Sequence, residues 1–282
     1  MNNTASVRRA PRQNIFNTTW GVCQFAFFWA IVILHLPFIL IVPRGRASVA
    51  YSRFFFWTLA RLMRVRVRVN GKISSRRPLL LVCNHISVFE FATFPIALGA
   101  GFFGKKEIAS MPLVGWIAKK FGVVFIDRRP SHAMDALVAV RDEMSRVSYP
   151  MVLFPEGTTT NGAYVKEFKS SLFNVVENAD IAVQPLVMHY RFRDGTPIND
   201  EDLAQHYAYF DNAKQDMGPR CKRERSAFGQ IFHVMVMGGF LVEITILPVQ
   251  NLKDMDRKQM AAHLHGLMSA QYMQRKDKKR DE

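Results

Sequence analysis

An apolar run of 23 residues, from position 20 to position 42, constrains the fold of this chain most strongly. Only Gln24, His35 and Pro37 interrupt it. A helix that rises about 1.5 Å per residue over this length could cross a hydrocarbon core of roughly 30 Å. Because arginines flank both ends and Pro37 lies inside, the run could instead form one arm of a helical hairpin that enters one leaflet, with residues 52–62 as the second arm at the interface. A buried core helix is the third interpretation.

The charge of the chain is unevenly distributed. The net charge is +15, and the 13 Lys and Arg residues before Glu90 are uncompensated, because no Asp or Glu precedes it. A basic segment beside a long apolar run predicts contact with an anionic membrane surface. Nucleic acid is not an expected partner, since no zinc-finger spacing, aromatic ribonucleoprotein motif or helix-turn-helix pattern is present. The three scattered cysteines indicate no disulfide framework, which fits a domain on the cytoplasmic face of a membrane.

After residue 62, apolar strands alternate with helical patterns. This alternation predicts an α/β domain with a mostly parallel central sheet flanked by helices. The strict Arg-Val alternation at 64–69 predicts a strand with one arginine face and one valine face. Further strands are expected at 79–83, 122–126, 149–154, 181–189 and 239–247, with helices at 110–119 and 131–146 and a short helix after 253, while 194–230 receive no assignment. The expected organisation is a basic polar tail (1–19), a membrane helix or hairpin (20–62), the α/β domain (63–250), and a C-terminal helix with a basic tail (251–282).

A histidine and a carboxylate lie close together after the strand expected at 79–83. His85 would fall at the carboxyl end of that strand, where α/β sheets usually carry their sites. A histidine held by a carboxylate can act as a general base near neutral pH. Residues five apart lie about 140° apart on a helix. His85 and Glu90 can therefore meet only if His85 precedes the helix and Glu90 lies in its first turn.

A second role competes for Glu90. Ser87-Val88-Phe89-Glu90 has the sequence of a capping box, in which Glu90 would bond the backbone N–H of Ser87 at a helix start. Both roles use carboxylate oxygens, and the sequence leaves the choice between them open.

Two later loops carry groups suited to phosphate. In the stretch from Phe154 to Thr160, a strand end is followed by Pro155, Glu156, Gly157 and three threonines, whose hydroxyl and N–H groups could surround an anion. The stretch from Gly122 to Arg129 places arginine at another strand end. Taken separately, these stretches are equally typical of a polar turn and a surface ion pair.

Together and in this order, the motifs resemble the glycerolipid acyltransferase family, which includes the lysophosphatidic acid acyltransferases. The family pattern is Asn-His-x-x-x-x-Asp, Gly-x-x-x-Ile-Asp-Arg, Phe-Pro-Glu-Gly-Thr and a late Val-x-Pro, and the resemblance spans about residues 60–250. The matching residues here are Asn84-His85 with Glu90, Gly122 with Ile126-Asp127-Arg128, Phe154-Pro155-Glu156-Gly157-Thr158, and Val183-Gln184-Pro185, with further likeness at Phe103-Gly104-Lys105 and Pro112-Leu113-Val114-Gly115.

The resemblance implies a membrane-bound acyltransferase, located in the inner membrane if the source is bacterial. His85 would be the general base for a lysophospholipid hydroxyl that attacks the thioester of acyl-CoA or acyl-carrier protein, and Glu90 would orient it. The expected product is phosphatidic acid made from 1-acyl-glycerol-3-phosphate, with lysophosphatidylcholine, lysophosphatidylethanolamine or lyso-ornithine lipid as alternative acceptors. No metal, other cofactor or covalent acyl-enzyme is expected. The implied substrate-binding residues are Asn84, Lys105, Arg128, Glu156, Gly157 and Thr158.

Two departures from the family pattern keep other functions open. Glu90 replaces the family Asp and is one methylene longer, and Lys169-Ser170 replaces a Lys-Gly pair. A membrane lipid-binding protein with a degenerate site is therefore the alternative from a different class. A serine hydrolase is disfavoured, because no Gly-x-Ser-x-Gly motif is present. His263 and His265 are expected on a solvated helix face rather than in a metal site.

Overall fold

A seven-stranded sheet forms the centre of the computed structural model, which describes residues 10, 14–126, 133–208 and 226–277. The strand order is β1-β7-β6-β2-β5-β3-β4. Among these strands, only β6 and β7 pair antiparallel, so the prediction of a mostly parallel sheet is confirmed. The strands are β1 (Arg66–Asn70), β2 (Leu79–Cys83), β3 (Gly101–Lys105), β4 (Val123–Ile126), β5 (Met151–Leu153), β6 (Ala182–Arg191) and β7 (Leu241–Ile246).

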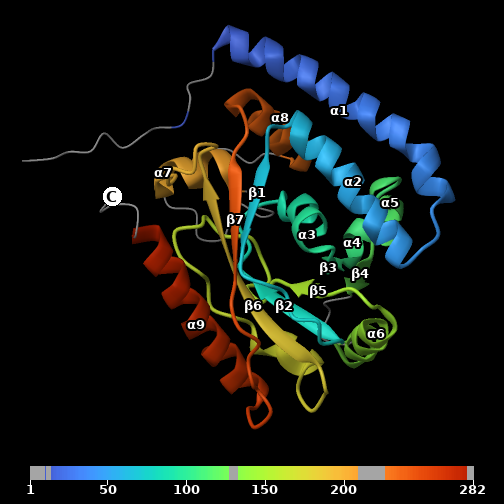
Figure 1. Cartoon of the computed structure of the whole chain (residues 1–282), viewed down its shortest axis with the longest axis vertical. Helices are drawn as coiled ribbons and strands as arrows, with labels where there is room; N and C mark the ends of the chain where they lie inside the picture. Colours follow the sequence, from blue (N-terminus) through green and yellow to red (C-terminus); the bar gives the residue numbers. More distant parts are fainter. Residues whose placement is uncertain (1–9, 11–13, 127–132, 209–225, 278–282) are drawn as a thin grey trace, which may run out of the picture.

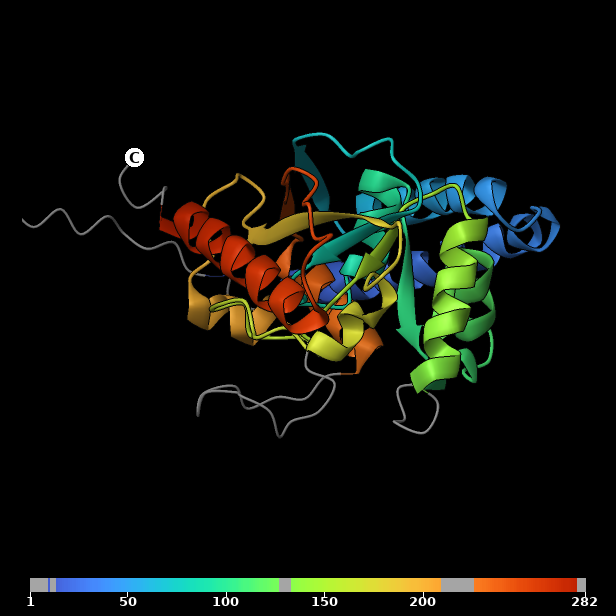
Figure 2. The ribbon, with the colours of Figure 1, turned by 90° about the horizontal axis from the view of Figure 1, so that it is seen from below.

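Helices cover the sheet on both sides. Figures 1 and 2 show α9 lying along β6, and α6 lying at the end of the sheet that carries β4. β2, β6 and β7 are buried along their whole length, which explains their nearly continuous apolar sequences. The helices after the N-terminal pair are α3 (Glu90–Leu98), α4 (Lys106–Ala109), α5 (Val114–Lys120), α6 (Ala133–Arg146), α7 (Asp200–Asp202), α8 (Ala227–Met237) and α9 (Arg257–Asp277), with helical turns η2 (Ser170–Val175) and η3 (Leu203–Tyr207).

The N-terminal apolar run folds as one arm of a helical hairpin. α1 (Ile15–Ile41) and α2 (Arg46–Leu62) pack against each other, and Nδ1 of His35 lies 2.7 Å from the hydroxyl oxygen of Tyr51. Two predicted boundaries were wrong. α1 begins at Ile15, so the polar tail does not extend to residue 19, and the second arm begins at Arg46 rather than at residue 52. The hairpin itself agrees with one of the alternatives that the sequence left open.

Only one face of α1 is buried. Its apolar outer side is exposed, with Phe27 at 63% and Leu34 at 67%, which argues against a core helix. By length and composition, α1 is the one helix in the described part of the chain that could cross a membrane. Figure 1 shows it on the outside of the molecule, beside α2 and α8. The buried stripe, at helical spacing, consists of Gly21, Gln24, Phe28, Val32, His35 and Ile39.

Apart from the short helices and helical turns α4, α7, η2 and η3, the sequence analysis missed β3 and α8, and it underestimated the length of α9. β3 contains Gly101 and Gly104, which strand propensity disfavours, but a Cβ at Gly101 would lie 2.5 Å from the carbonyl oxygen of Gly122. α8 lies at the end of the unassigned region, although Ser226 caps its start by accepting from the N–H of Gly229. The C-terminal helix is not short, because α9 has 21 residues.

A close backbone approach joins α2 to the sheet. Gly239 has a φ of +80°, and a Cβ there would lie 2.6 Å from the carbonyl oxygen of Met63 and would also meet that of Arg64. Arg64 itself has a φ of +58° at the turn into β1. The entry of the hairpin into the sheet therefore depends on a residue without a side chain.

We predict that Gly239→Ala destabilises the protein strongly. The left-handed backbone alone costs a residue with a Cβ about 1–3 kcal/mol, and the contact with the Met63 carbonyl adds to it. Gly266→Ala in α9 is the matched control, because no atom lies within 4 Å of its Cβ position. That control should be neutral or stabilising by up to about 1 kcal/mol. Thermal unfolding in detergent measures both, and equal midpoints would contradict the prediction.

Candidate functional site

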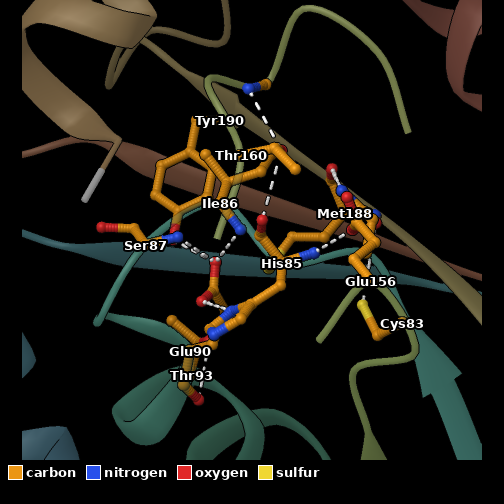
Figure 3. A network of polar contacts seen from close by, with 12 residues as sticks. Cys83, His85, Ile86, Ser87, Glu90, Thr93, Glu156, Thr160, Met188 and Tyr190 are labelled. Atoms are coloured by element: carbon orange, nitrogen blue, oxygen red, sulfur yellow. Dashed lines mark hydrogen bonds and ion pairs between the residues drawn. The ribbon is translucent and has the colours of Figure 1, made fainter. Parts of the chain in front are cut away.

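His85 lies directly after β2, where the carboxyl ends of the parallel strands β2 to β6 lie together. We call this end of the sheet, at the strand termini, the His85 edge. Its side chain is 18% exposed, and its ring stacks on Phe154 with centroids 4.2 Å apart. Nδ1 lies 2.7 Å from Oε2 of Glu90 (Figure 3). In the described part of the chain, no hydrogen bond engages Nε2. The ring is thus fixed through one nitrogen, and the other is available for proton transfer.

Glu90 is the first residue of α3 and is 1% exposed. The sequence geometry is thereby confirmed, since His85 precedes the helix and Glu90 lies in its first turn. While Oε2 faces His85, Oε1 accepts hydrogen bonds from the N–H of Ile86 (3.1 Å), the N–H of Ser87 (2.8 Å) and the hydroxyl of Tyr190 (3.0 Å). Each oxygen therefore serves one of the two competing roles.

Only half of the predicted capping box forms. Glu90 bonds the Ser87 N–H as expected, but the Ser87 hydroxyl is buried and donates to the carbonyl of Tyr207 at 2.7 Å. The residue before the helix, Phe89, has no side-chain cap. Because the Ser87 hydroxyl is buried and donates to Tyr207, it is not a candidate nucleophile.

Asn84 joins β2 to β6. Its Nδ2 donates to the carbonyl of Met188 at 3.0 Å, and its Oδ1 accepts from the N–H of the same residue at 2.8 Å. Its side chain is buried, and both polar groups of its amide are engaged. In this arrangement Asn84 fixes the strand ends beneath His85 and presents no free group to a substrate.

Glu156 also holds backbone groups of the site in place. Its Oε1 accepts from the N–H of His85 at 2.6 Å, and its Oε2 accepts from the N–H of Lys166 at 3.0 Å. The carboxyl is buried, and burial outweighs these two hydrogen bonds and raises its pKa to about 8. Glu156 thus ties the end of β2 to the loop that follows β5.

That loop lies beside His85. The N–H of Thr160 donates to the carbonyl of His85 at 2.9 Å. Gly157 has a φ of +72°, and a Cβ there would lie 2.7 Å from Nζ of Lys169, so the ammonium group passes over this glycine. Thr158, the next residue in the loop, is partly exposed. Lys169, which matches the Lys of the family's Lys-Gly pair and was given no role from the sequence, supplies positive charge to the loop that was expected to hold phosphate.

For two predicted site residues, the structure describes the backbone position at most. Lys105 is the last residue of β3 and pairs with Ile126 on β4, so its backbone lies on the His85 edge, where the parallel strands end. Arg128 lies outside the described residues, two positions after the end of β4.

No sequence motif predicted the role of α9. Three of its side chains contact backbone carbonyls of the loop between Glu156 and Lys169. The hydroxyl of Tyr272 donates to Gly162, Nζ of Lys276 donates to Ala163 at 2.6 Å, and Nε2 of His265 lies 3.1 Å from the oxygen of Val165. His263 instead contacts Oε1 of Gln250 at 3.0 Å. The two histidines therefore have separate partners, and the absence of a metal stays a prediction.

A model of the family described as Acyltransferase matches residues 64–189. These residues therefore form a domain of this family. The lyso-ornithine lipid O-acyltransferase of Pseudomonas aeruginosa is 36% identical over 174 residues, which cover 58% of this chain and 66% of that protein. The enzyme of the same name from Rhizobium meliloti is 32% identical over 49% of each chain. The 1-acyl-sn-glycerol-3-phosphate acyltransferase of Neisseria meningitidis is 26% identical over 39% of this chain and 44% of that protein.

The matched segments thus span from under half to about two thirds of these relatives. Among solved structures, the 1-acyl-sn-glycerophosphate acyltransferase PlsC of Thermotoga maritima has the same fold, with a TM-score of 0.63. The two structures share 16% identity, and the match covers 92% of this chain and 98% of PlsC. The predicted family and fold class are therefore confirmed.

We predict that Glu90→Gln folds but loses most of its acyltransferase activity. The amide oxygen can replace Oε1 towards its three donors, and the amide NH₂ then faces Nδ1 of His85. Nδ1 must accept this bond, so the proton moves to Nε2 and the base is lost. In a serine protease the equivalent change costs on the order of 10⁴-fold in kcat. Steady-state rates test this, with the exposed Glu107→Gln as control. An unchanged rate would show that the pair does not act in acyl transfer.

We also predict that Glu156 makes stability depend on pH. Its folded pKa of about 8 exceeds the ordinary value of 4.5, so the folded state binds the proton more tightly than the unfolded state. Stability from this group is full below pH 4.5 and is lost as the pH rises through about 8. Unfolding midpoints between pH 5 and 9 should fall in the wild type, and this part of the slope should vanish in Glu156→Gln. The exposed Glu167→Gln should keep the wild-type slope.

Proposed function

We propose that this chain transfers a fatty acyl group from a thioester donor to the free hydroxyl of a lysolipid. The contact of 2.7 Å between Nδ1 of His85 and Oε2 of Glu90 carries the proposal, because it fixes the tautomer that a general base needs. The longer side chain of Glu90 keeps this contact, which speaks against a degenerate site.

In the proposed reaction, Nε2 of His85 takes the proton from the acceptor hydroxyl as its oxygen attacks the thioester carbonyl. The C–S bond then breaks, and the thiol leaves with that proton. Glu90 stabilises the imidazolium formed in between. The donor is acyl-CoA or acyl-carrier protein, and no enzyme-bound acyl group, metal or other cofactor takes part.

Gly157, Thr158, Lys105 and Arg128 are proposed to hold the polar end of the acceptor, as the family resemblance implies. The ammonium of Lys169 over Gly157 supports a site for negative charge there. We assign Asn84 and Glu156 as positioning residues instead, because backbone groups occupy their polar atoms.

The acceptor is proposed to be a lyso-ornithine lipid. The relatives with that name reach 36% and 32% identity, against 26% for the relative named for 1-acyl-sn-glycerol-3-phosphate. 1-acyl-glycerol-3-phosphate, which would yield phosphatidic acid, is the second candidate. It is supported by the motif resemblance and by the PlsC-like fold.

The apolar outer face of α1 is proposed to hold the protein on a membrane, with the domain on the cytoplasmic face. Trp20 and Phe27 are more than half exposed on this face, and an exposed surface of this size is typical of a lipid contact. The basic residues before Glu90 would then lie near anionic head groups.

An acceptor assay tests the proposed function. Purified protein in detergent receives acyl-CoA or acyl-carrier protein with lyso-ornithine lipid, 1-acyl-glycerol-3-phosphate or lysophosphatidylcholine. We expect the highest kcat/KM with lyso-ornithine lipid and no transfer by His85→Ala. A preference for 1-acyl-glycerol-3-phosphate would support the second acceptor. If neither donor supports transfer to any acceptor, the proposal is wrong and a lipid-binding function takes its place.

A further inference from the structure

A group of arginines lies on the His85 edge, where β6 ends and β1 and β7 begin. The register places Arg66 on β1 opposite Leu241 on β7, and Leu241 opposite Arg191 on β6. Neighbouring strands are about 4.8 Å apart, so Arg66 and Arg191 lie about 10 Å apart across the sheet. Arg193 follows two residues later, in the turn closed by the bond from the Gly195 N–H to the carbonyl of Phe192. Arg64 leads into β1 from α2.

These arginines differ in how their charge is balanced. Arg191 and Arg275 share the carboxylate of Glu243, at 2.6 and 3.6 Å. In the described part of the chain, no carboxylate pairs with Arg64, Arg66 or Arg193. Unpaired positive charge is thus concentrated at the tip of β6 and the start of β1.

Arg193 has a buried hydrogen-bond donor that is left unsatisfied. Its Nε is buried and has no hydrogen-bond partner in the described part of the chain. Burial lowers the pKa of its guanidinium, and so does the positive charge of Arg64 and Arg66. A buried donor without a partner is costly, and guanidinium groups match phosphate oxygens in geometry and charge. A bound anion would satisfy this donor and balance the charge of the three arginines.

We propose that Arg64, Arg66 and Arg193 bind a phosphate group of the thioester donor, which is shared by coenzyme A and by the phosphopantetheine of a carrier protein. This inference rests on the proposed acyl transfer. Arg193 lies five residues beyond Met188, which Asn84 bonds beneath His85, so about 15 Å of strand separates them. The cluster is therefore too distant for the reacting carbonyl but suited to a remote part of the donor, whose binding contributes to the reaction.

The face of the sheet on which the arginines lie favours binding of a soluble thioester donor over contact with the membrane. Side chains two apart on a strand share a face, so Arg66 lies on the same face of β1 as Asn70. Asn70 bonds Glu243, which also contacts Arg275 of α9. Val65 and Val67 alternate to the opposite face, and α3 packs against β1 and α2. The arginine face therefore points to the α9 side, away from the hairpin that carries the exposed apolar side chains.

Binding of coenzyme A and of holo carrier protein to the full chain in detergent tests the proposal. Arg66→Gln/Arg193→Gln should raise the dissociation constant of the donor by about tenfold or more, because charge-assisted hydrogen bonds are lost. The matched control is Arg76→Gln/Lys253→Gln, which removes the same charge from two exposed positions outside the cluster and should change the affinity less than about twofold.

Kinetics with two donors give a second measurement. In the cluster variant, the KM for acyl-CoA should rise, whereas the KM and the kcat for the acyl-pantetheine thioester, which lacks phosphate, should stay unchanged. Equal affinities in the cluster and control variants, no binding of either probe to the wild type, or a rise in KM for both donors would overturn the inference. So would a loss of binding to anionic vesicles with donor affinity intact. If the wild type binds donor through the cluster but acylates no lysolipid, the proposed function fails instead.

Discussion

The carboxylate of Glu90 is the interaction on which the rest of the site depends. One oxygen orients His85, while the other accepts from two backbone N–H groups at the start of α3 and from Tyr190 on β6. The same group therefore fixes the turn after β2, the first residue of the helix and the neighbouring strand. A buried carboxylate with four donors is compensated electrostatically, and one partner fewer would leave a costly unsatisfied group. The same carboxylate therefore orients the base and stabilises the local fold around it.

The elements that sequence reasoning found are those whose pattern is decided locally. The buried run of β2 and the alternating β1 were recognisable because side-chain burial sets their composition. β3 was missed because Gly101 is required by the close approach of the Gly122 carbonyl, a contact between residues that are distant in the chain. α8 was missed because its burial depends on packing against α1 and η3 rather than on a pattern of its own.

The candidate site shows the same division. His85 and Glu90 are five residues apart. Helix geometry alone predicted that they can meet only if His85 precedes the helix and Glu90 lies in its first turn. Asn84 and Glu156 matched the family motifs, but their positioning roles appear only when Met188 and Lys166 are brought to them by the fold. The contacts of Tyr272 and Lys276 with the loop after β5 span more than 100 residues of sequence, and no local pattern encodes them. Predictability thus ends where a role depends on a partner from another element.

The antiparallel pair of β6 and β7 explains why the basic N-terminal part of the chain meets the site at all. In a fully parallel sheet, the start of β1 would lie at the edge opposite to His85. Because β7 runs antiparallel to β6 and β1 runs parallel to β7, the start of β1 lies instead where β2 and β6 end. The chain that leaves the N-terminal hairpin therefore places Arg64 and Arg66 at the His85 edge. An acidic residue beside Arg64 or Arg66 would partly neutralise the positive charge of that edge.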